Sequence, residues 1–173
     1  MKKRVLYKVL VAGDANVGKT TLVHRYVDGI FIDSATMTIG VEFVMEEIPI
    51  NDVQVQLQIW DIGGQQRFRF MVEKYIPGAK GALLLFDTTN MTSFVNIEKW
   101  TKILRTHDES LPIILVATKC DLEEYSIVRD YYPELKQKKL NMLDYIKTSA
   151  KTGLNVEEVF KVLAKHLVNH SSP

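Results

Sequence analysis

Residues 9–23, VLVAGDANVGKTTLV, leave little freedom in how this part of the chain can fold. The apolar start predicts a buried strand. The spacing Gly13-x-x-x-x-Gly18-Lys19-Thr20 that follows is typical of a phosphate-binding loop placed between a strand and a helix. Its glycines let successive N–H groups turn toward one point, and the start of the helix adds free donors. We therefore expect a nucleoside-phosphate site, with Lys19 at the β- and γ-phosphates and the Thr20 hydroxyl on Mg²⁺. A glycine turn with a surface lysine is the alternative.

The composition predicts one domain over residues 1–173, because a chain of this length with 46% hydrophobic residues can bury a substantial core. A net charge of +1 argues against a nucleic-acid partner held by bulk charge. No apolar run approaches the roughly 20 residues that span a bilayer, and the first residues lack the apolar core of a signal peptide. Lys2 and the cysteine-free end VNHSSP offer no lipidation site, and the single Cys120 fits a reducing compartment. We expect a cytoplasmic protein without a membrane anchor in this chain.

Alternating strand and helix patterns predict an α/β fold with a mostly parallel, six-stranded sheet and one antiparallel strand. A hairpin turning at Asn51-Asp52 supplies the antiparallel strand, and the segment 123–141 is the least clear because Pro133 limits where its helix can begin. Ligands of such folds bind beyond the carboxyl ends of the strands. The expected strands are Val5–Ala12, Val41–Ile50, Val53–Trp60, Ala82–Phe86, Ile113–Ala117 and Tyr145–Thr148; the expected helices are Lys19–Asp28, Ser93–His107 and one that Asn155 caps with Glu158.

The stretch WDIGGQ follows one of these strands and predicts further phosphate chemistry. Asp61 can hold Mg²⁺ through water, the Gly64 N–H can meet a terminal phosphate, and Gln65 can orient an attacking water. In the threonine-rich loop before it, Thr36 and Thr38 are candidates for a second hydroxyl ligand of Mg²⁺. Taken singly, these stretches fit an ordinary Asp-Gly-Gly turn and a solvated loop.

Two more stretches after strands predict a base site. Asp121 can accept hydrogen bonds from N1–H and the 2-amino group of guanine, a donor pair that adenine lacks, and the Lys119 stem can cover the base. In the segment Thr148–Lys151, small residues allow backbone N–H groups to meet a base carbonyl. Each stretch alone is a common turn, and only their shared position beyond buried strands makes them informative.

In this order, the five stretches resemble the small GTPases of the Ras superfamily, over residues 5–167. Within the superfamily the Rab branch is most similar, through TIGVEF at 38–43, QQRF at 65–68, Tyr75 and Gly78-Ala79. The resemblance implies a three-layer P-loop NTPase fold, the Ras-like G domain. It also implies a molecular switch that hydrolyses GTP to GDP with Mg²⁺, slowly unless a partner supplies an arginine. Effectors, exchange factors and GTPase-activating proteins are the implied partners, besides the guanine nucleotide.

The resemblance also implies a set of site residues. The implied nucleotide-binding residues are Gly13, Asp14, Ala15, Asn16, Val17, Gly18, Lys19, Thr20, Thr21, Phe31 (edge-on to the guanine), Thr38, Gly64, Thr118, Lys119, Asp121, Ser149, Ala150 and Lys151. Thr20, Thr38 and Asp61 are the implied Mg²⁺ ligands, and Gln65 and Lys19 the catalytic residues.

Strand alternation separately predicts the surface on which partners bind. Val53, Val55, Leu57 and Ile59 fall on the core face, whereas Trp60 shares the other face with three glutamines. A partly exposed tryptophan between mobile loops is a good interface anchor. The Rab resemblance adds Phe43 and Tyr75 to Trp60 as an effector-binding triad. The alternative is that these aromatics only cover the edge of the sheet.

Several positions depart from the family pattern. Thr118 stands where most members have an asparagine that ties the base loop to the phosphate loop, so we expect guanine selection to persist in weaker form. Ile62-Gly63 replaces Thr-Ala, and the extra glycine predicts a more flexible second switch. Ala15 and Asn16 are expected to alter intrinsic hydrolysis. A non-hydrolysing module of the same fold and a P-loop nucleotide kinase are the rival functions. The kinase would need a second substrate pocket and an arginine-rich lid.

Overall fold

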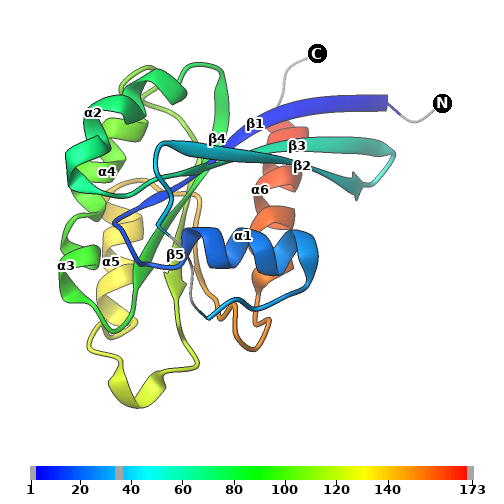
Figure 1. The fold of residues 1–173 in the computed structure, drawn as a ribbon. Coiled ribbons are helices and arrows are strands. Elements are labelled where there is room, and N and C mark those ends of the chain that lie inside the picture. Colours follow the sequence, from blue (N-terminus) through cyan, green and yellow to red (C-terminus); the bar gives the residue numbers. More distant parts are fainter. Residues whose placement is uncertain (1–2, 34–36, 171–173) are drawn as a thin grey trace.

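The computed structural model, which describes residues 3–33 and 37–170, contains the predicted six-stranded sheet in the order β2-β3-β1-β4-β5-β6 (Figure 1). Only the β2–β3 pair is antiparallel, and every other neighbouring pair is parallel. The predicted topology is therefore confirmed. The strands are β1 (Lys3–Gly13), β2 (Val41–Ile50), β3 (Val53–Ile62), β4 (Ala79–Asp87), β5 (Ile113–Thr118) and β6 (Asp144–Lys147).

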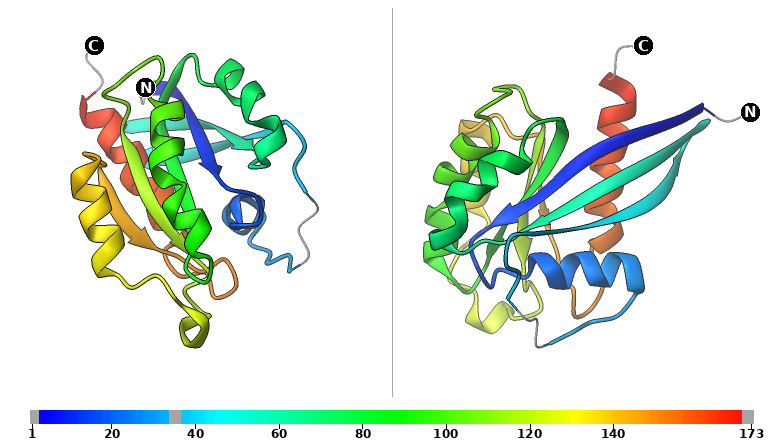
Figure 2. Two further views of the ribbon diagram at one scale, coloured as in Figure 1. Left: turned by 90° about the vertical axis from the view of Figure 1, so that its left-hand side faces the viewer. Right: turned by 45° about the horizontal axis from the view of Figure 1, so that its top comes forward.

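Helices cover both faces of the sheet (Figure 2). On one face lie α1 (Lys19–Asp28) and α6 (Val156–His170), and on the other α2 (Arg69–Val72), α3 (Met91–Val95), α4 (Ile97–Leu104) and α5 (Tyr131–Lys139). The central strand β1 shows why: Val9 and Val11 pack into the core beneath α1 and α6, whereas Leu10 and Ala12 pack into the opposite core. A strand buried on both faces needs the continuous apolar run that the sequence provides.

The predicted helix Ser93–His107 is interrupted at Asn96, so two helices, α3 and α4, replace one. Its apolar face is as expected, since Phe94, Ile97, Trp100 and Leu104 are buried. The start lies earlier than predicted because the Asn90 side chain accepts a hydrogen bond (3.2 Å) from the Ser93 N–H and caps α3.

The predicted capping box at α6 is wrong. Asn155 does precede the helix, but its backbone is left-handed (φ 52°), not in the extended conformation of an N-cap, and its amide donates to the Lys147 carbonyl at 2.8 Å. In the segment that the sequence left unclear, α5 begins at Tyr131. Pro133 lies in its first turn, where a missing N–H costs no helical hydrogen bond.

The carboxyl ends of the parallel strands meet at one edge of the sheet, where the loops after β1, β3, β4, β5 and β6 gather (Figure 1). The α/β rule places the ligand site there. Within residues 3–33 and 37–170, no helix combines the length and the apolar character needed to cross a membrane.

Candidate nucleotide-binding site

The loop after β1 has the geometry expected of a phosphate-binding loop. Asn16 and Gly18 have positive φ (63° and 98°), and α1 begins directly after Gly18. Gly13 also has a positive φ (140°), and a Cβ there would lie 2.3 Å from the Leu85 carbonyl oxygen, so only glycine fits against β4. The Lys19 ammonium donates to the Asp14 carbonyl at 2.6 Å. Burial lowers the pKa of Lys19 to about 8, which leaves a cation that an anionic ligand would stabilise.

The three candidate Mg²⁺ ligands converge on one point. The Thr20 hydroxyl donates to Oδ2 of Asp61 at 2.5 Å and lies 2.7 Å from the Thr38 hydroxyl. Among the residues that the structure describes, Oδ1 of Asp61 is buried without a hydrogen-bond partner, and burial raises the pKa of this carboxyl group. Two hydroxyls and one under-satisfied carboxylate are hard oxygen donors that fit Mg²⁺. The other candidate, Thr36, lies outside the described residues.

The loop after β3 contacts the phosphate loop and the threonine-rich loop through its backbone. A Cβ on Gly64 would lie 2.3 Å from the Gly13 carbonyl oxygen and 2.6 Å from the Ala15 nitrogen. The Gly63 N–H donates to the Gly40 carbonyl at 2.8 Å, and a Cβ on Gly63 would lie 2.6 Å from the Thr38 carbonyl oxygen. The extra glycine thus permits close packing between the two loops, a role that the sequence reasoning, which considered only flexibility, missed.

Two adjoining cavities occupy this edge of the sheet. The larger, about 420 Å³, is lined by Asn16, Val17, Gly18, Thr21, Leu22, Phe31, Ile32, Asp33, Thr118, Lys119, Asp121, Leu122, Thr148, Ala150 and Lys151. The smaller, about 50 Å³, is lined by Ala15, Asn16, Gly18, Lys19, Thr20, Thr21, Met37, Thr38, Gly64 and Gln65. The larger volume is in the range of small-molecule sites. The structure therefore brings most of the predicted residues together around one space.

Asp14 and Ser149 were predicted to contact the nucleotide, but their side chains line neither cavity. The Ser149 hydroxyl donates to Oδ1 of Asp121 at 2.6 Å and so orients the carboxylate at the base end. The Asp14 carboxylate accepts hydrogen bonds from side chains behind the loop. A one-dimensional motif cannot distinguish a residue that lines a site from one that supports it.

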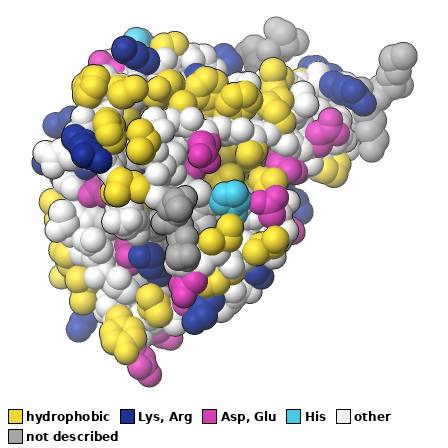
Figure 3. Space-filling view, in the orientation of Figure 1, with side chains coloured by type: hydrophobic (Ala, Val, Ile, Leu, Met, Phe, Trp, Pro, Cys, Tyr) yellow, Lys and Arg dark blue, Asp and Glu magenta, His cyan; other side chains and the backbone are white. Residues whose placement is uncertain are grey.

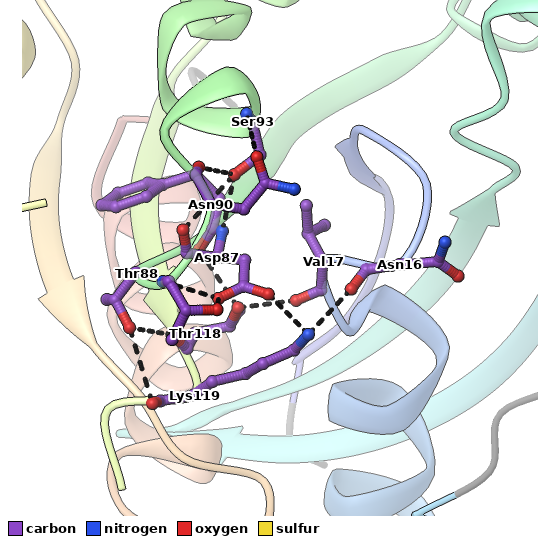
Figure 4. A network of polar contacts seen from close by, with 10 residues as sticks. Asn16, Val17, Asp87, Thr88, Asn90, Ser93, Thr118 and Lys119 are labelled. Carbon is purple, nitrogen blue, oxygen red and sulfur yellow. Dashed lines mark hydrogen bonds and ion pairs between the residues drawn. The ribbon is translucent and has the colours of Figure 1, made fainter. Parts of the chain in front are cut away.

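The hydroxyl of Thr118 makes the link that asparagine makes in most of the family. It donates to the Val17 carbonyl at 2.6 Å and lies 3.1 Å from the Phe86 carbonyl (Figure 4). Lys119 also links the base loop to the phosphate loop, since its ammonium donates to the Asn16 carbonyl oxygen at 3.0 Å. The base loop is therefore tied to the phosphate loop in this chain too.

Asp87 was not among the predicted site residues; it ends β4 and is buried. Its Oδ2 pairs with the Lys119 ammonium at 2.5 Å, and its Oδ1 accepts from the backbone and hydroxyl of Thr89 (Figure 4). The signal was available, because Asp87 directly follows the apolar run ALLLF and the strand-end rule applies to it equally.

The three aromatic residues of the predicted partner surface do lie together. Trp60 stacks on Phe43 with ring centroids 5.7 Å apart and lies 6.1 Å from the Tyr75 ring. The Lys8 ammonium lies 3.8 Å from the Trp60 ring centroid, and Phe43 is 58% exposed. Hydrophobic side chains form a band over α2 and the β2–β3 hairpin (Figure 3). As predicted, Trp60 is half-buried and faces away from the core that holds Leu57.

Comparison with known proteins agrees with this geometry. The sequence model of the Ras family matches residues 8–169. The chain belongs to the Ras family. Among its relatives, human Ras-related protein Rab-7L1 is 36% identical over 96% of this chain and 85% of its own length. Ras-related protein Rab-19 of Xenopus laevis is 37% identical over 94% and 77%, and GTP-binding protein YPTM1 of Zea mays is 37% identical over 92% and 76%. The resemblance to a Rab-like Ras-family protein is therefore confirmed.

Proposed function

We propose that this Ras-family chain is a molecular switch that binds guanine nucleotide, hydrolyses GTP to GDP and phosphate with Mg²⁺, and is recognised by partner proteins in its GTP state. The observation that carries the proposal is the pair of adjoining cavities. The larger has Asp121 on its wall, and the smaller is lined by Lys19 and by two of the residues that would hold Mg²⁺, Thr20 and Thr38. The third, Asp61, accepts from the Thr20 hydroxyl. A base at one end and phosphates at the other fit this arrangement.

Base selection rests on Asp121. The Ser149 hydroxyl engages its Oδ1, so the carboxylate is held in a defined orientation on the cavity wall. A fixed carboxylate accepts from the N1–H and 2-amino group of guanine, whereas adenine would cover the carboxylate without offering it this pair of donors.

The phosphate end supplies positioning and charge. Lys19 neutralises the β- and γ-phosphates, the Gly64 N–H faces the terminal phosphate, and Gln65 orients the attacking water. When bound at Thr20, Thr38 and Asp61, Mg²⁺ supplies further charge neutralisation. Arg67 donates to Oε1 of Gln65 at 2.7 Å and Arg69 to Asp14 at 2.5 Å, so neither arginine faces the phosphates here. An arginine from a partner should then accelerate hydrolysis by roughly 10³–10⁵.

Partner recognition is assigned to Phe43, Trp60 and Tyr75. Phe43 belongs to β2, directly after the loop that carries Thr38, and Tyr75 ends the helical segment 66–75 that follows Gln65. Loss of the γ-phosphate would release both loops and so disturb the surface that the three rings build.

Single-turnover phosphate release from GTP-loaded protein tests the proposal. We expect slow first-order release that requires Mg²⁺, and we expect Gln65→Leu to slow it by about tenfold or more, because the water loses its orienting group. GDP affinity should be nearly unchanged, since Gln65 does not hold the nucleotide. Release no faster than from free GTP would instead identify a non-hydrolysing guanine-nucleotide module.

A further inference from the structure

The Asp14 carboxylate in the phosphate loop is the meeting point of three distant segments. Its Oδ1 accepts from Nη2 of Arg69 (2.5 Å) and Nε1 of Trp100 (2.8 Å), and its Oδ2 accepts from Nδ2 of Asn96 (2.6 Å). The donors come from α2, from α4 and from the junction between α3 and α4. The carboxylate is only 15% exposed, so these contacts replace most of its hydration.

The Arg69 side chain is largely enclosed beside the Asp14 carboxylate. Its side chain is 18% exposed, and its guanidinium lies 5.1 Å from the Trp100 ring centroid. Within the described part of the chain, its Nε is buried and has no hydrogen-bond partner. A guanidinium in such a place depends on its partner, because removing one member of a buried ion pair leaves an uncompensated charge.

The backbone of Asp14 is where the phosphate loop meets residues 63–69, which are called the second switch here. Its carbonyl accepts from the Lys19 ammonium at 2.6 Å. A Cβ on Gly64 would come within 2.5 Å of its carbonyl carbon, so Gly64 lies directly against it. The second switch therefore contacts Asp14 twice, through the backbone at Gly64 and through the side chain of Arg69. Gln65 lies between these two contacts.

We propose that Arg69 is a positioning residue for GTP hydrolysis, which it serves by pairing with Asp14 and so holding Gly64 and Gln65 against the phosphate loop. In the structure the pair is formed while Gly64 lies against the phosphate loop. This inference rests on the proposed function.

The test compares Arg69→Gln, Arg69→Lys and the control Lys74→Gln, which removes an exposed cation from the same segment. Arg69→Gln should slow single-turnover hydrolysis about tenfold, as misplacement of reacting groups does, while GDP affinity stays within about twofold. Only Nη2 makes the pair with Asp14, so Arg69→Lys keeps a charged donor and should recover most of the rate. Lys74→Gln should hydrolyse at the wild-type rate.

Trp100 provides a second readout, because its indole donates to Asp14 and lies beside the guanidinium. The chain has two tryptophans, so Trp60→Phe leaves Trp100 as the only one. In this background its emission should differ between the GDP state and the state with a non-hydrolysable GTP analogue, and Arg69→Gln should abolish the difference.

Several results would overturn the inference: a wild-type hydrolysis rate in Arg69→Gln, an equal loss in Arg69→Lys, or Trp100 emission that does not depend on Arg69. A parallel loss of GDP affinity and hydrolysis would also overturn it, since that pattern marks a structural role alone. Absence of hydrolysis in the wild-type protein would count against the proposed function itself.

Discussion

At the scale of single residues, the absence of a Cβ at Gly63 determines how closely two loops of the site can pack. Gly63 lies against the carbonyl of Thr38. The Thr38 hydroxyl contacts the hydroxyl of Thr20, which in turn donates to Asp61. The extra glycine therefore lets the loop that carries Thr38 pack closely against the loop that carries Gly63. This is the place where Mg²⁺ and the γ-phosphate would be held. Flexibility, the property that the sequence suggests first, does not describe this contact.

Gly63→Ala tests this contact. Its Cβ would lie 2.6 Å from the Thr38 carbonyl oxygen, closer than real Cβ contacts, so Thr38 must move. We expect the affinity for a GTP analogue with Mg²⁺ to fall about tenfold, because Thr38 is assigned to the Mg²⁺ and γ-phosphate end of the site. The affinity for GDP, which has no γ-phosphate, should change little. Fluorescent nucleotide titrations measure both affinities in one preparation. An equal loss for the two nucleotides would contradict this role.

At the scale of elements, the sequence predicts each strand to within a few residues because apolar runs and alternation are local signals. Lys19–Asp28 is predicted to the residue, since Gly18 and Gly29 both adopt left-handed conformations at its ends. The break at Asn96 is not predictable in this way. The side-chain amide of Asn96 donates to Asp14, 82 residues away in the sequence. A contact between residues so far apart produces no periodic pattern in the sequence.

The aromatic surface is built by β2, by the end of β3 and by the short 3-10 helix η2 (Glu73–Tyr75) that follows α2. Trp60→Ala tests its role. Trp60 lines neither cavity, so GTP binding should remain largely intact. Capture of a partner that prefers the GTP form should be lost, because the middle ring of the triad is gone. A pull-down compares Gln65→Leu protein with and without Trp60→Ala. Ile127→Ala, an exposed apolar side chain after η3 (Glu123–Tyr125), is the control. Equal recovery with and without Trp60→Ala would show that partners bind elsewhere.

At the scale of the whole molecule, most candidate site residues are predictable because they follow buried parallel strands, whose ends meet at one edge. Lys19 begins α1, Asp61 lies at the end of β3, and Asp121 follows β5. Lys19 and Asp121 line the two adjoining cavities, and Asp61 accepts from Thr20 beside the smaller one. The direction in which a side chain points could not be predicted. Asp14 lies within the motif but points behind the loop, and Thr118 differs from the family asparagine yet makes an equivalent link. Both outcomes depend on packing between segments far apart in the sequence.

Because the site joins loops from across the sheet, ligand binding should stabilise the whole fold. GDP with Mg²⁺ at about 1,000 times its Kd adds about 4 kcal/mol to the free energy of unfolding. For a chain of this size that corresponds to a rise in Tm of about 10 °C. Chelation of Mg²⁺ with EDTA should reverse part of the rise, since Asp61 then faces the phosphates without a cation. Thermal unfolding followed by circular dichroism measures this. An unchanged Tm after EDTA treatment would argue against a metal held by Thr20, Thr38 and Asp61.

Competition between nucleotides for the protein tests guanine selection most directly. Protein loaded with fluorescent GDP and Mg²⁺ is challenged with excess GTP, ATP or xanthosine triphosphate, and displacement is followed by fluorescence. GTP should displace the probe and ATP should not, because Asp121 finds its two donors only on guanine. Asp121→Asn should shift the preference to xanthosine triphosphate, since the amide then faces a carbonyl. Equal displacement by ATP and GTP in the wild-type protein would contradict a guanine-nucleotide switch.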